Sequence, residues 1–251
     1  MAGWLFVSPA TILFLIFIAG PFVFAIGLAL FKWGLLTDPT FIGFDNFVAL
    51  FADPVLPRVL ANTFIFAFAS VVTHIVFGLL LAIAVNRVIN RYLSYFLRVA
   101  IFFPFLISWA AAWALPAIIF IDLWHTLGFT FIIMLAGLQT VPNELIEAAR
   151  TDGATSWQVF WRVTLPLMSP TMFFAMIITF IGAFQVFGPI QIITKGGPQG
   201  ATTTIVMYLY EKGFQSFDMG YAAAVAIVVF LIVMGVTLLQ FMGRRKWVHE
   251  A

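Results

Sequence analysis

Long uncharged stretches are the feature that most constrains how this chain can fold. Six largely apolar runs occur, each bounded by charges or by Pro and Gly: residues 4–31, 61–85, 99–115, 116–139, 167–190 and 221–242. A helix needs about 20 such residues to cross roughly 30 Å of hydrocarbon. Only 9% of the chain is charged, against about 25% in soluble domains. The sequence therefore predicts an all-α, polytopic membrane protein with six transmembrane helices in a single domain, residues 1–251.

The basic residues predict how the spans are oriented. The larger group falls on the side of the two chain ends: Arg87, Arg91, Arg98, Arg150, Arg162, Arg244, Arg245 and Lys246. The smaller group falls on the opposite side: Lys32, Arg58, Lys195 and Lys212. Short cytoplasmic loops collect Lys and Arg. We therefore expect a multi-pass protein with both termini in the cytoplasm.

The junction between the third and fourth runs leaves no residues for a turn. A hairpin between two helices normally takes at least two residues, yet Leu115 is followed directly by Pro116. Two explanations remain open. Either the third span is short and the turn centres on Pro116, or a segment is missing from the chain at this point.

The loop of residues 140–166 differs from the rest of the chain because it is polar and carries both acids and bases. Pro142 suits the first turn of a helix, and Gly153 can adopt the left-handed conformation that ends one. Ser156 is then expected to cap a second helix from Trp157 to Thr164. A simple solvated loop is the default interpretation of such a segment. The pattern predicts instead two short helices that protrude from the membrane.

The spacing within this loop resembles a known family motif. Glu147-Ala148-Ala149, three residues, Gly153, nine residues, Val163, one residue and Leu165-Pro166 is similar to the EAA loop of binding-protein-dependent ABC importer permeases. Val163 stands where the family often has Ile. Further segments are similar to the carbohydrate-uptake branch, in particular to maltose-type and glycerol-phosphate-type first permease subunits. They are Gly43–Phe47, Phe103-Pro104-Phe105, Ala136–Gln139, Gly196-Gly197-Pro198 and Phe217–Ala222.

The resemblance implies the type I ABC importer permease fold, with the loop as a coupling helix that docks on a cytoplasmic ATPase dimer. It implies an ATPase contact at Glu147, Ala148, Ala149, Asp152, Gly153, Ala154, Leu165 and Pro166. Further implied partners are a second permease subunit, an extracytoplasmic solute-binding protein and the lipid of a prokaryotic inner membrane. The chain lacks a G-x-x-x-x-G-K-[ST] phosphate loop. We therefore expect a transport subunit, not an enzyme, without a cofactor of its own, and ATP and Mg²⁺ in the partner.

Polar residues inside apolar spans indicate the solute path, because such groups are costly in hydrocarbon and normally face a cavity or a partner. Asp122, Thr126 and Phe129 share one helical face in the fourth span. In the fifth span the candidates are Thr179, Ala183 and Gln185. Asp122 could instead only end a helix at the outer surface, and Thr179 could bond back to its own helix. His74 and His125 are expected to be buried hydrogen-bonding residues, with no metal site.

Several functions remain to be separated. No span contains Lys or Arg, which favours a neutral sugar or polyol, while glycerol phosphate stays open. No basic stripe is present to hold a nucleic acid. A secondary transporter would show internal repeats, and an intramembrane enzyme would show a motif such as H-E-x-x-H; neither occurs in the sequence. The sequence predicts an ATP-driven import subunit for a sugar or polyol.

Overall fold

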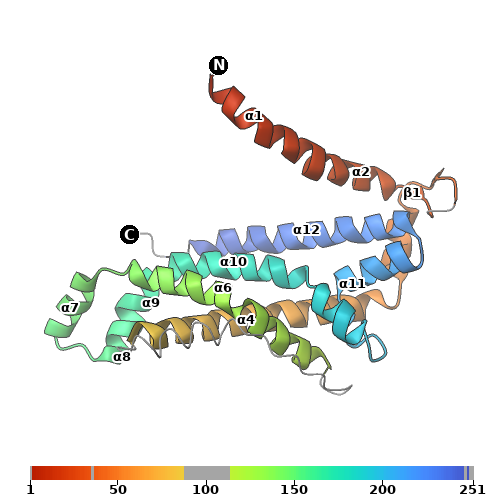
Figure 1. Ribbon diagram of the computed structural model, residues 1–251. Helices are drawn as coiled ribbons and strands as arrows, with labels where there is room; N and C mark the ends of the chain where they lie inside the picture. The colour runs from red at the N-terminus through yellow and green to blue at the C-terminus, as the bar shows by residue number, and fades with distance from the viewer. Residues whose placement is uncertain (1, 35–36, 88–113, 246–247, 249–251) are drawn as a thin grey trace. The chain divides into compact units, whose positions relative to one another are not determined.

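The computed structural model describes residues 2–34, 37–87, 114–245 and 248, and within these it is mostly helical (Figure 1). A hairpin of two short antiparallel strands, β1 (Phe31–Lys32) and β2 (Thr40–Phe41), pairs Phe31 with Phe41. The helices, in which η marks a π-helical turn, are α1 (Ala2–Phe14), η1 (Leu15–Ala19), α2 (Gly20–Leu28), α3 (Asp45–Ala52), α4 (Leu56–Arg87), α6 (Ala114–Gln139), α7 (Asn143–Thr151), α8 (Ser156–Val159), η3 (Phe160–Thr164), α9 (Leu165–Leu167), α10 (Ser169–Phe184), η4 (Ile190–Thr194), α11 (Ile205–Tyr210), η5 (Glu211–Gln215) and α12 (Met219–Arg244).

Four helices within the described residues are long and apolar enough to cross a membrane. They cover Val7–Leu28, Leu56–Asn86, Ala114–Gln139 and Met219–Arg244, and a bent pair, Ser156–Leu167 with Ser169–Phe184, makes a fifth if its two helices are taken as one span. Hydrocarbon offers no water to the backbone, so a span must pair its own N–H and C=O groups, as a helix does. The prediction of an all-α membrane protein is confirmed.

The predicted third span, residues 99–115, lies outside the described residues except for its last two positions, which begin α6. The same holds for Arg91, Arg98, Lys246 and the segment Phe103–Phe105. Pro116 lies in the first turn of α6, where its missing N–H leaves no intrahelical bond unmade. A turn centred on Pro116 is therefore wrong.

A bend of 63° separates Ser156–Leu167 from α10. Pro170 has no N–H, so it cannot donate to the carbonyl of Pro166 as a helical residue would. The hydroxyl of Ser169 donates to that carbonyl instead, at 2.6 Å. Met168, the residue at the bend, is fully buried. The predicted fifth span was expected to run to about residue 190, but α10 ends at Phe184.

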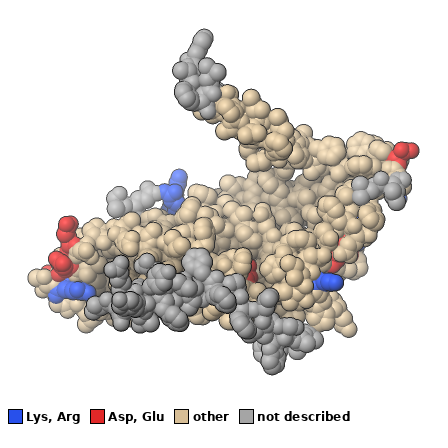
Figure 2. All heavy atoms as spheres, viewed as in Figure 1, with Lys and Arg blue, Asp and Glu red and all other residues tan. Residues whose placement is uncertain are grey.

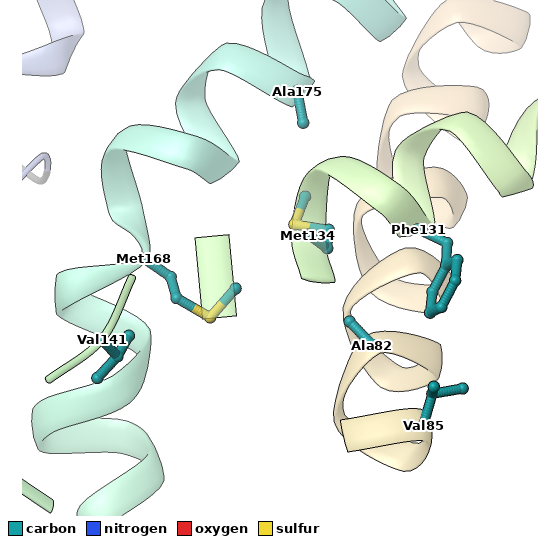
Figure 3. Close-up of a cluster of buried hydrophobic side chains, with 7 residues drawn as sticks. All are labelled: Ala82, Val85, Phe131, Met134, Val141, Met168 and Ala175. Atoms are coloured by element: carbon teal, nitrogen blue, oxygen red, sulfur yellow. The ribbon is translucent and has the colours of Figure 1, made fainter. Parts of the chain in front are cut away.

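The chain divides into two compact units, Met1–Leu60 with Thr204–Ile232, and Ala61–Thr203 with Val233–Ala251. The prediction of one domain over residues 1–251 stays a prediction. In the second unit, α4, α6 and α10 surround a buried cluster of Ala82, Val85, Phe131, Met134, Val141, Met168 and Ala175 (Figure 3). Gly137 allows α6 and α10 to approach closely, because a Cβ there would lie 2.6 Å from Cγ2 of Thr171.

The segments that join the apolar runs on the side opposite the chain ends contain secondary structure. Residues 32–60 include α3 and the beginning of α4, and residues 191–217 include α11 and η5. In the first unit the side-chain amide of Asn46 donates to the carbonyls of Ala29 and Phe31, at 2.8 and 2.9 Å. Gly220 lies against the same strand, since a Cβ there would overlap the carbonyl oxygen of Phe31. This contact explains the glycine at the start of α12.

Asp53 joins α3 to α11 and α12 within the first unit. Both Tyr208 and Tyr221 donate hydrogen bonds from their hydroxyls to its Oδ2 atom. Nζ of Lys212 lies 3.7 Å from the same atom and 5.2 Å from the centroids of both tyrosine rings. Burial alone would raise the pKa of Asp53, but these hydrogen bonds, that of the Val55 N–H and the Lys212 charge hold it below its usual value. Burial and the bond to Asp53 raise the pKa of Tyr208, which keeps its phenol a donor.

Replacing Gly220 with Ala should destabilise the protein. The added methyl group has no room beside the Phe31 carbonyl, and overpacking of this kind costs about 1–3 kcal/mol. Thermal unfolding of the detergent-solubilised protein should show a lower Tm. Gly235→Ala, on the same helix, is the matched control, because a Cβ there meets nothing within 4 Å. Equal Tm values for the two variants would contradict this packing.

Replacing Asp53 with Asn should weaken the first unit at neutral pH by about 1.5–3 kcal/mol, the range for hydrogen bonds to a charged group. The pKa of Asp53 is lower in the folded protein, so its ionised form favours folding. That contribution is complete above the unfolded pKa of about 3.9 and disappears as the pH falls through the folded pKa. Unfolding measured between neutral pH and about pH 3 should show the difference between wild type and variant shrinking in acid. Asp38→Asn, at an exposed position, should show no such difference, and a pH-independent difference for Asp53→Asn would refute the account.

Candidate functional site

The loop between α6 and α10 places its first helix, α7, at one end of the second unit. Pro142 is the N-cap of α7 in extended conformation, one position before the predicted first turn. Glu144 lies in the first turn and Arg150 in the last, each at the end of the helix dipole that favours its charge. Figure 2 shows charged side chains at the end of the molecule where Figure 1 places α7.

A Schellman turn ends α7. The N–H of Gly153 donates to the carbonyl of Arg150 and the N–H of Ala154 to the carbonyl of Ala149, both at 3.0 Å. These two bonds define the motif, which needs a left-handed residue after the cap. Gly153 fills that position with φ of +84°. The prediction that Gly153 ends the first helix in a left-handed conformation is confirmed. The spacing from Ala149 to Gly153 thus has a structural reason.

The second helix is capped by Thr155, so the prediction of Ser156 as the cap is wrong. The N–H of Gln158 donates to the Thr155 hydroxyl at 3.3 Å, and the N–H of Thr155 donates to Oε1 of Gln158 at 2.8 Å. This reciprocal pair is a capping box, and its Thr-x-x-Gln signal is visible in the sequence. Gly153 and the N-cap residue Thr155 are two positions apart in the chain. The turn between α7 and α8 is therefore short, and hydrogen bonds hold it at both ends. The helix also runs on through Pro166 to Leu167 and does not end at Thr164.

The eight predicted coupling residues divide by exposure. Glu147, Ala148, Asp152 and Gly153 are exposed on α7 and its turn. Ala149 and Ala154 are half-buried, and their backbones form the Schellman hydrogen bond that spans the larger number of residues. Leu165 and Pro166 are half-buried as well, but they belong to α9, next to the bend into α10. The first six therefore form one surface, and the last two lie apart from it.

Two apolar side chains attach the loop to the membrane-spanning helices. Val141, just before α7, is a member of the buried cluster, and Ile146 of α7 packs against it. Between the loop and the ends of α4 and α6 lies a cavity of about 270 Å³, lined among others by Asn86, Leu138, Glu147 and Phe160. Movement of α7 would therefore displace side chains of the buried cluster that joins α4, α6 and α10.

The polar residues predicted in the fourth span form part of a hydrogen-bonded group between α4 and α6. The hydroxyl of Ser70 donates to Oδ2 of Asp122 at 3.2 Å. His74, fully buried, donates from Nδ1 to the carbonyl of Ser70 at 2.6 Å and is hydrogen-bonded through Nε2 to the hydroxyl of Thr126. Asp122 therefore lies within α6 and does not end it. His74 is a buried hydrogen-bonding residue, as predicted, whereas His125 is exposed.

The other predicted path residues are not brought into this group. Phe129 is 58% exposed on α6, Thr179 is half-buried and Ala183 buried on α10, and Gln185 follows the end of α10. No hydrogen bond joins them to Asp122 or Thr126 within the part of the chain that the structure describes. Across the described residues of the chain, no group of three or more His, Asp or Glu side chains is arranged to hold a metal ion.

Sequence reasoning missed two polar residues that fix the site. Ser70 is assigned to the site only by its hydrogen bond to Asp122 on another helix, which the structure shows. Asn62 of α4 donates from its side-chain amide to the carbonyls of Gly200 and Thr203, at 3.0 and 3.1 Å. It thereby fastens the loop before α11 to the membrane-spanning helix. Asn62 stands near the start of an apolar run and Ser70 in its middle, and neither position alone indicates which partner the side chain contacts.

Comparison with known proteins identifies the family. Residues 10–247 match the model of the family described as "Binding-protein-dependent transport system inner membrane component". The probable ABC transporter permease protein YurN of Bacillus subtilis is 33% identical over 94% of each chain. The sn-glycerol-3-phosphate transport system permease protein UgpA of Rhizobium meliloti is 30% identical over 98% of this chain and 95% of its own.

A solved structure supports the same assignment. A chain from a bacterial ABC transporter involved in the import of alginate, an acidic polysaccharide, superposes with a TM-score of 0.80 at 26% identity, over 97% of this chain and 96% of that one. The alignment with YurN runs over 274 positions, more than the 251 residues of this chain, so YurN contains residues without a counterpart here. The chain belongs to the binding-protein-dependent transport system inner membrane component family, as a multi-pass transport permease subunit of ABC importers.

Proposed function

We propose that this permease subunit carries a sugar or a related polyol into the cell, driven by ATP hydrolysis in a separate ATPase subunit that docks on α7. The observation that carries the proposal is the Schellman turn at Gly153, which presents Glu147 and Ala148 to solvent at the charged end of the second unit. A short, exposed and well-capped helix is suited to a docking role. ATP and Mg²⁺ would bind to the partner, because this chain has no phosphate loop.

The proposed contact has a chemical logic. Glu147 is exposed and offers a carboxylate to an Arg or Lys of the ATPase. Ala148 allows close approach, and Asp152 and Gly153 extend the surface around the turn. The backbone hydrogen bond between Ala149 and Ala154 stabilises the turn on its half-buried side. Leu165 and Pro166, next to the 63° bend, would pass movement of the loop to α10.

Further partners follow from the family description, which makes transport dependent on a binding protein. An extracytoplasmic solute-binding protein would deliver the solute, and a second permease subunit would complete the path as a heterodimer. The span Val7–Leu28 supports this, since none of its residues is buried within the chain. Its apolar surface would therefore contact lipid or that second subunit. Both termini would lie in the cytoplasm of a prokaryotic cell.

The solute path would pass Asp122, Thr126 and Phe129 on α6 and Thr179, Ala183 and Gln185 near α10. A carboxylate, hydroxyls and an exposed aromatic ring suit a polyhydroxy solute. A second candidate is glycerol phosphate, because UgpA, 30% identical, is a glycerol-phosphate transport permease. The absence of Lys and Arg from the six apolar runs of the sequence favours the neutral solute.

Reconstitution in proteoliposomes tests the function. The chain would be combined with its cognate ATPase, second permease and binding protein, and uptake of a panel of sugars, polyols and sn-glycerol 3-phosphate measured. We expect uptake that requires ATP and the binding protein. Transport by this chain alone under a proton or sodium gradient would indicate an ion-coupled secondary transporter and refute the proposal.

Replacing Gly153 with Val should uncouple the ATPase. A non-glycine residue in the left-handed region costs about 1–2 kcal/mol, and a β-branched residue tolerates it least. The turn should open and the Glu147 surface move, with loss of ATPase co-purification and of ATP-driven uptake at unchanged permease levels. Gly153→Asn is the matched control, because Asn adopts this conformation readily, and it should retain most of the activity. Equal activity of wild type and Gly153→Val would contradict the coupling role.

Replacing Asp122 with Asn should lower solute uptake without unfolding the protein. The amide oxygen can still accept the hydrogen bond of Ser70, so the helix contact survives while the charge is lost. Ser70→Ala is the complementary variant, since it removes the hydrogen bond and keeps the charge. We expect Asp122→Asn to raise KM for uptake and Ser70→Ala chiefly to lower Tm. Unchanged uptake kinetics in Asp122→Asn would remove this residue from the path.

A further inference from the structure

We propose that the second half of the loop, Ser156–Leu167, is an interfacial helix that lies along the membrane surface, with its aromatic face in the headgroup region of a leaflet containing anionic lipid. The proposed function assigns the ATPase contact to α7 and its turn; this inference goes beyond it and gives the neighbouring helix a different partner, the lipid surface itself.

The aromatic face consists of Trp157, Phe160 and Trp161. Their ring centroids are 5.5 Å apart for Trp157 with Trp161 and for Phe160 with Trp161, and 6.4 Å apart for Trp157 with Phe160. Trp157 is 69% exposed and Trp161 is 49% exposed. Val159 and Thr164 of the same segment are buried against the protein. The segment therefore has one face on the protein and one large aromatic face with no cover in the described chain.

Tryptophan is the side chain that best fits a lipid headgroup region, because its ring is apolar and its indole N–H still reaches water. Two tryptophans separated by one helical turn give this segment a double anchor. A face that was simply solvated would leave both large rings in water, at the cost of the hydrophobic effect.

The orientation of the segment agrees with such a position. It is bent by 63° from α10, and spans are tilted on average by only about 20° from the membrane normal. With α10 near the membrane normal, the segment lies closer to the membrane plane than to that normal. In Figure 1, α8 and α9 run across the ends of α4, α6 and α10 in the second unit, whereas α7 reaches further out. The cavity lined by Asn86 and Phe160 also places the segment beside the end of α4.

Charge separates the two halves of the loop. The first half has three acids, Glu144 and Glu147 on α7 and Asp152 at its C-cap, against one base, Arg150, whereas Ser156–Leu167 contains no acid and has Arg162 exposed beside Trp161. A basic residue near an anionic membrane surface is stabilised by electrostatic attraction to the lipid headgroups. The acids of α7 would be repelled by the same surface. The first half thus suits a protein partner and the second half an anionic lipid surface.

The absence of cysteine in the chain makes a direct test practical. Trp157→Cys and Trp161→Cys would each be labelled with a nitroxide in the assembled transporter, in liposomes of phosphatidylethanolamine and phosphatidylglycerol. Collision of the label with oxygen, which enters lipid, would be compared with collision with a nickel chelate, which stays in water. Leu145→Cys on α7, at a site 46% exposed, is the matched control.

We expect labels at 157 and 161 to collide more with oxygen, with or without the ATPase subunit, and the label at 145 to collide more with the nickel chelate when the ATPase subunit is absent. Greater access of nickel than of oxygen at 157 and 161 would overturn the proposal in favour of a solvated face. Protection from both reagents only when the ATPase is bound would overturn it in favour of a protein contact. Neither result depends on whether ATP drives uptake, so failure of the proposed function would be seen separately.

A second measurement keeps the aromatic character of the native face. Tryptophan fluorescence of the wild type would be compared with that of Trp157→Phe/Trp161→Phe in liposomes whose acyl chains are brominated near the headgroup. The double variant should fold normally because each replacement is aromatic. Wild-type fluorescence should be quenched by a larger fraction than that of the variant. Equal quenched fractions would contradict an interfacial position for these two rings.

Discussion

The hydrogen bonds around Gly153 determine how the loop between α6 and α10 can present itself. The Schellman turn fixes the direction in which α7 ends, and the capping box at Thr155 fixes the direction in which α8 begins. Because the two caps are adjacent, α7 and α8 cannot reorient independently. Val141 and Ile146 then join this corner to the buried cluster between α4, α6 and α10. A force on α7 can therefore be transmitted to membrane-spanning helices through packed side chains.

The same corner separates two kinds of surface along a single loop. On the α7 side of Gly153 lie small residues and an excess of acids over the single base Arg150, and on the other side lie tryptophans and a base without an acid. If α8 and η3 rest on lipid, the membrane surface becomes a fixed reference against which α7 is held. The bend at Ser169, produced by Pro170 and stabilised by the Ser169 hydroxyl, is what allows a surface helix to continue into a span.

The sequence predicted most of this architecture because hydrocarbon imposes strong rules. The apolar runs gave the described spans to within a few residues, except that α4 begins at Leu56 and α10 ends at Phe184. The loop was recognisable from its polar composition and from the spacing of Glu147-Ala148-Ala149 to Gly153, the residue that takes the left-handed position of the Schellman turn. The Thr155 cap could also have been found, since Gln158 stands at the capping-box spacing.

What the sequence could not supply were the contacts between distant segments. In the sequence Asp53 has no feature that distinguishes it from other loop acids, and only the structure shows its contacts with Tyr208 and Lys212. The helix α11 was not predicted because a short helix depends on such tertiary contacts for its stability. Asp122 likewise had a path interpretation and a surface interpretation, and only the register between α4 and α6 revealed Ser70 as its partner. Helix pairing in a membrane is not encoded in apolar runs.

The claim at the centre of this account is that α7 contacts an ATPase subunit, and site-directed photo-cross-linking from position 148 tests it most directly. Ala148 is exposed, so Ala148→Cys can carry a photoactivatable maleimide in a chain that otherwise has no cysteine. Illumination of the assembled transporter should produce an adduct with the mass of this chain plus one ATPase subunit. A transporter that retains its ATPase and still yields adducts only with lipid or within the permease would contradict the account.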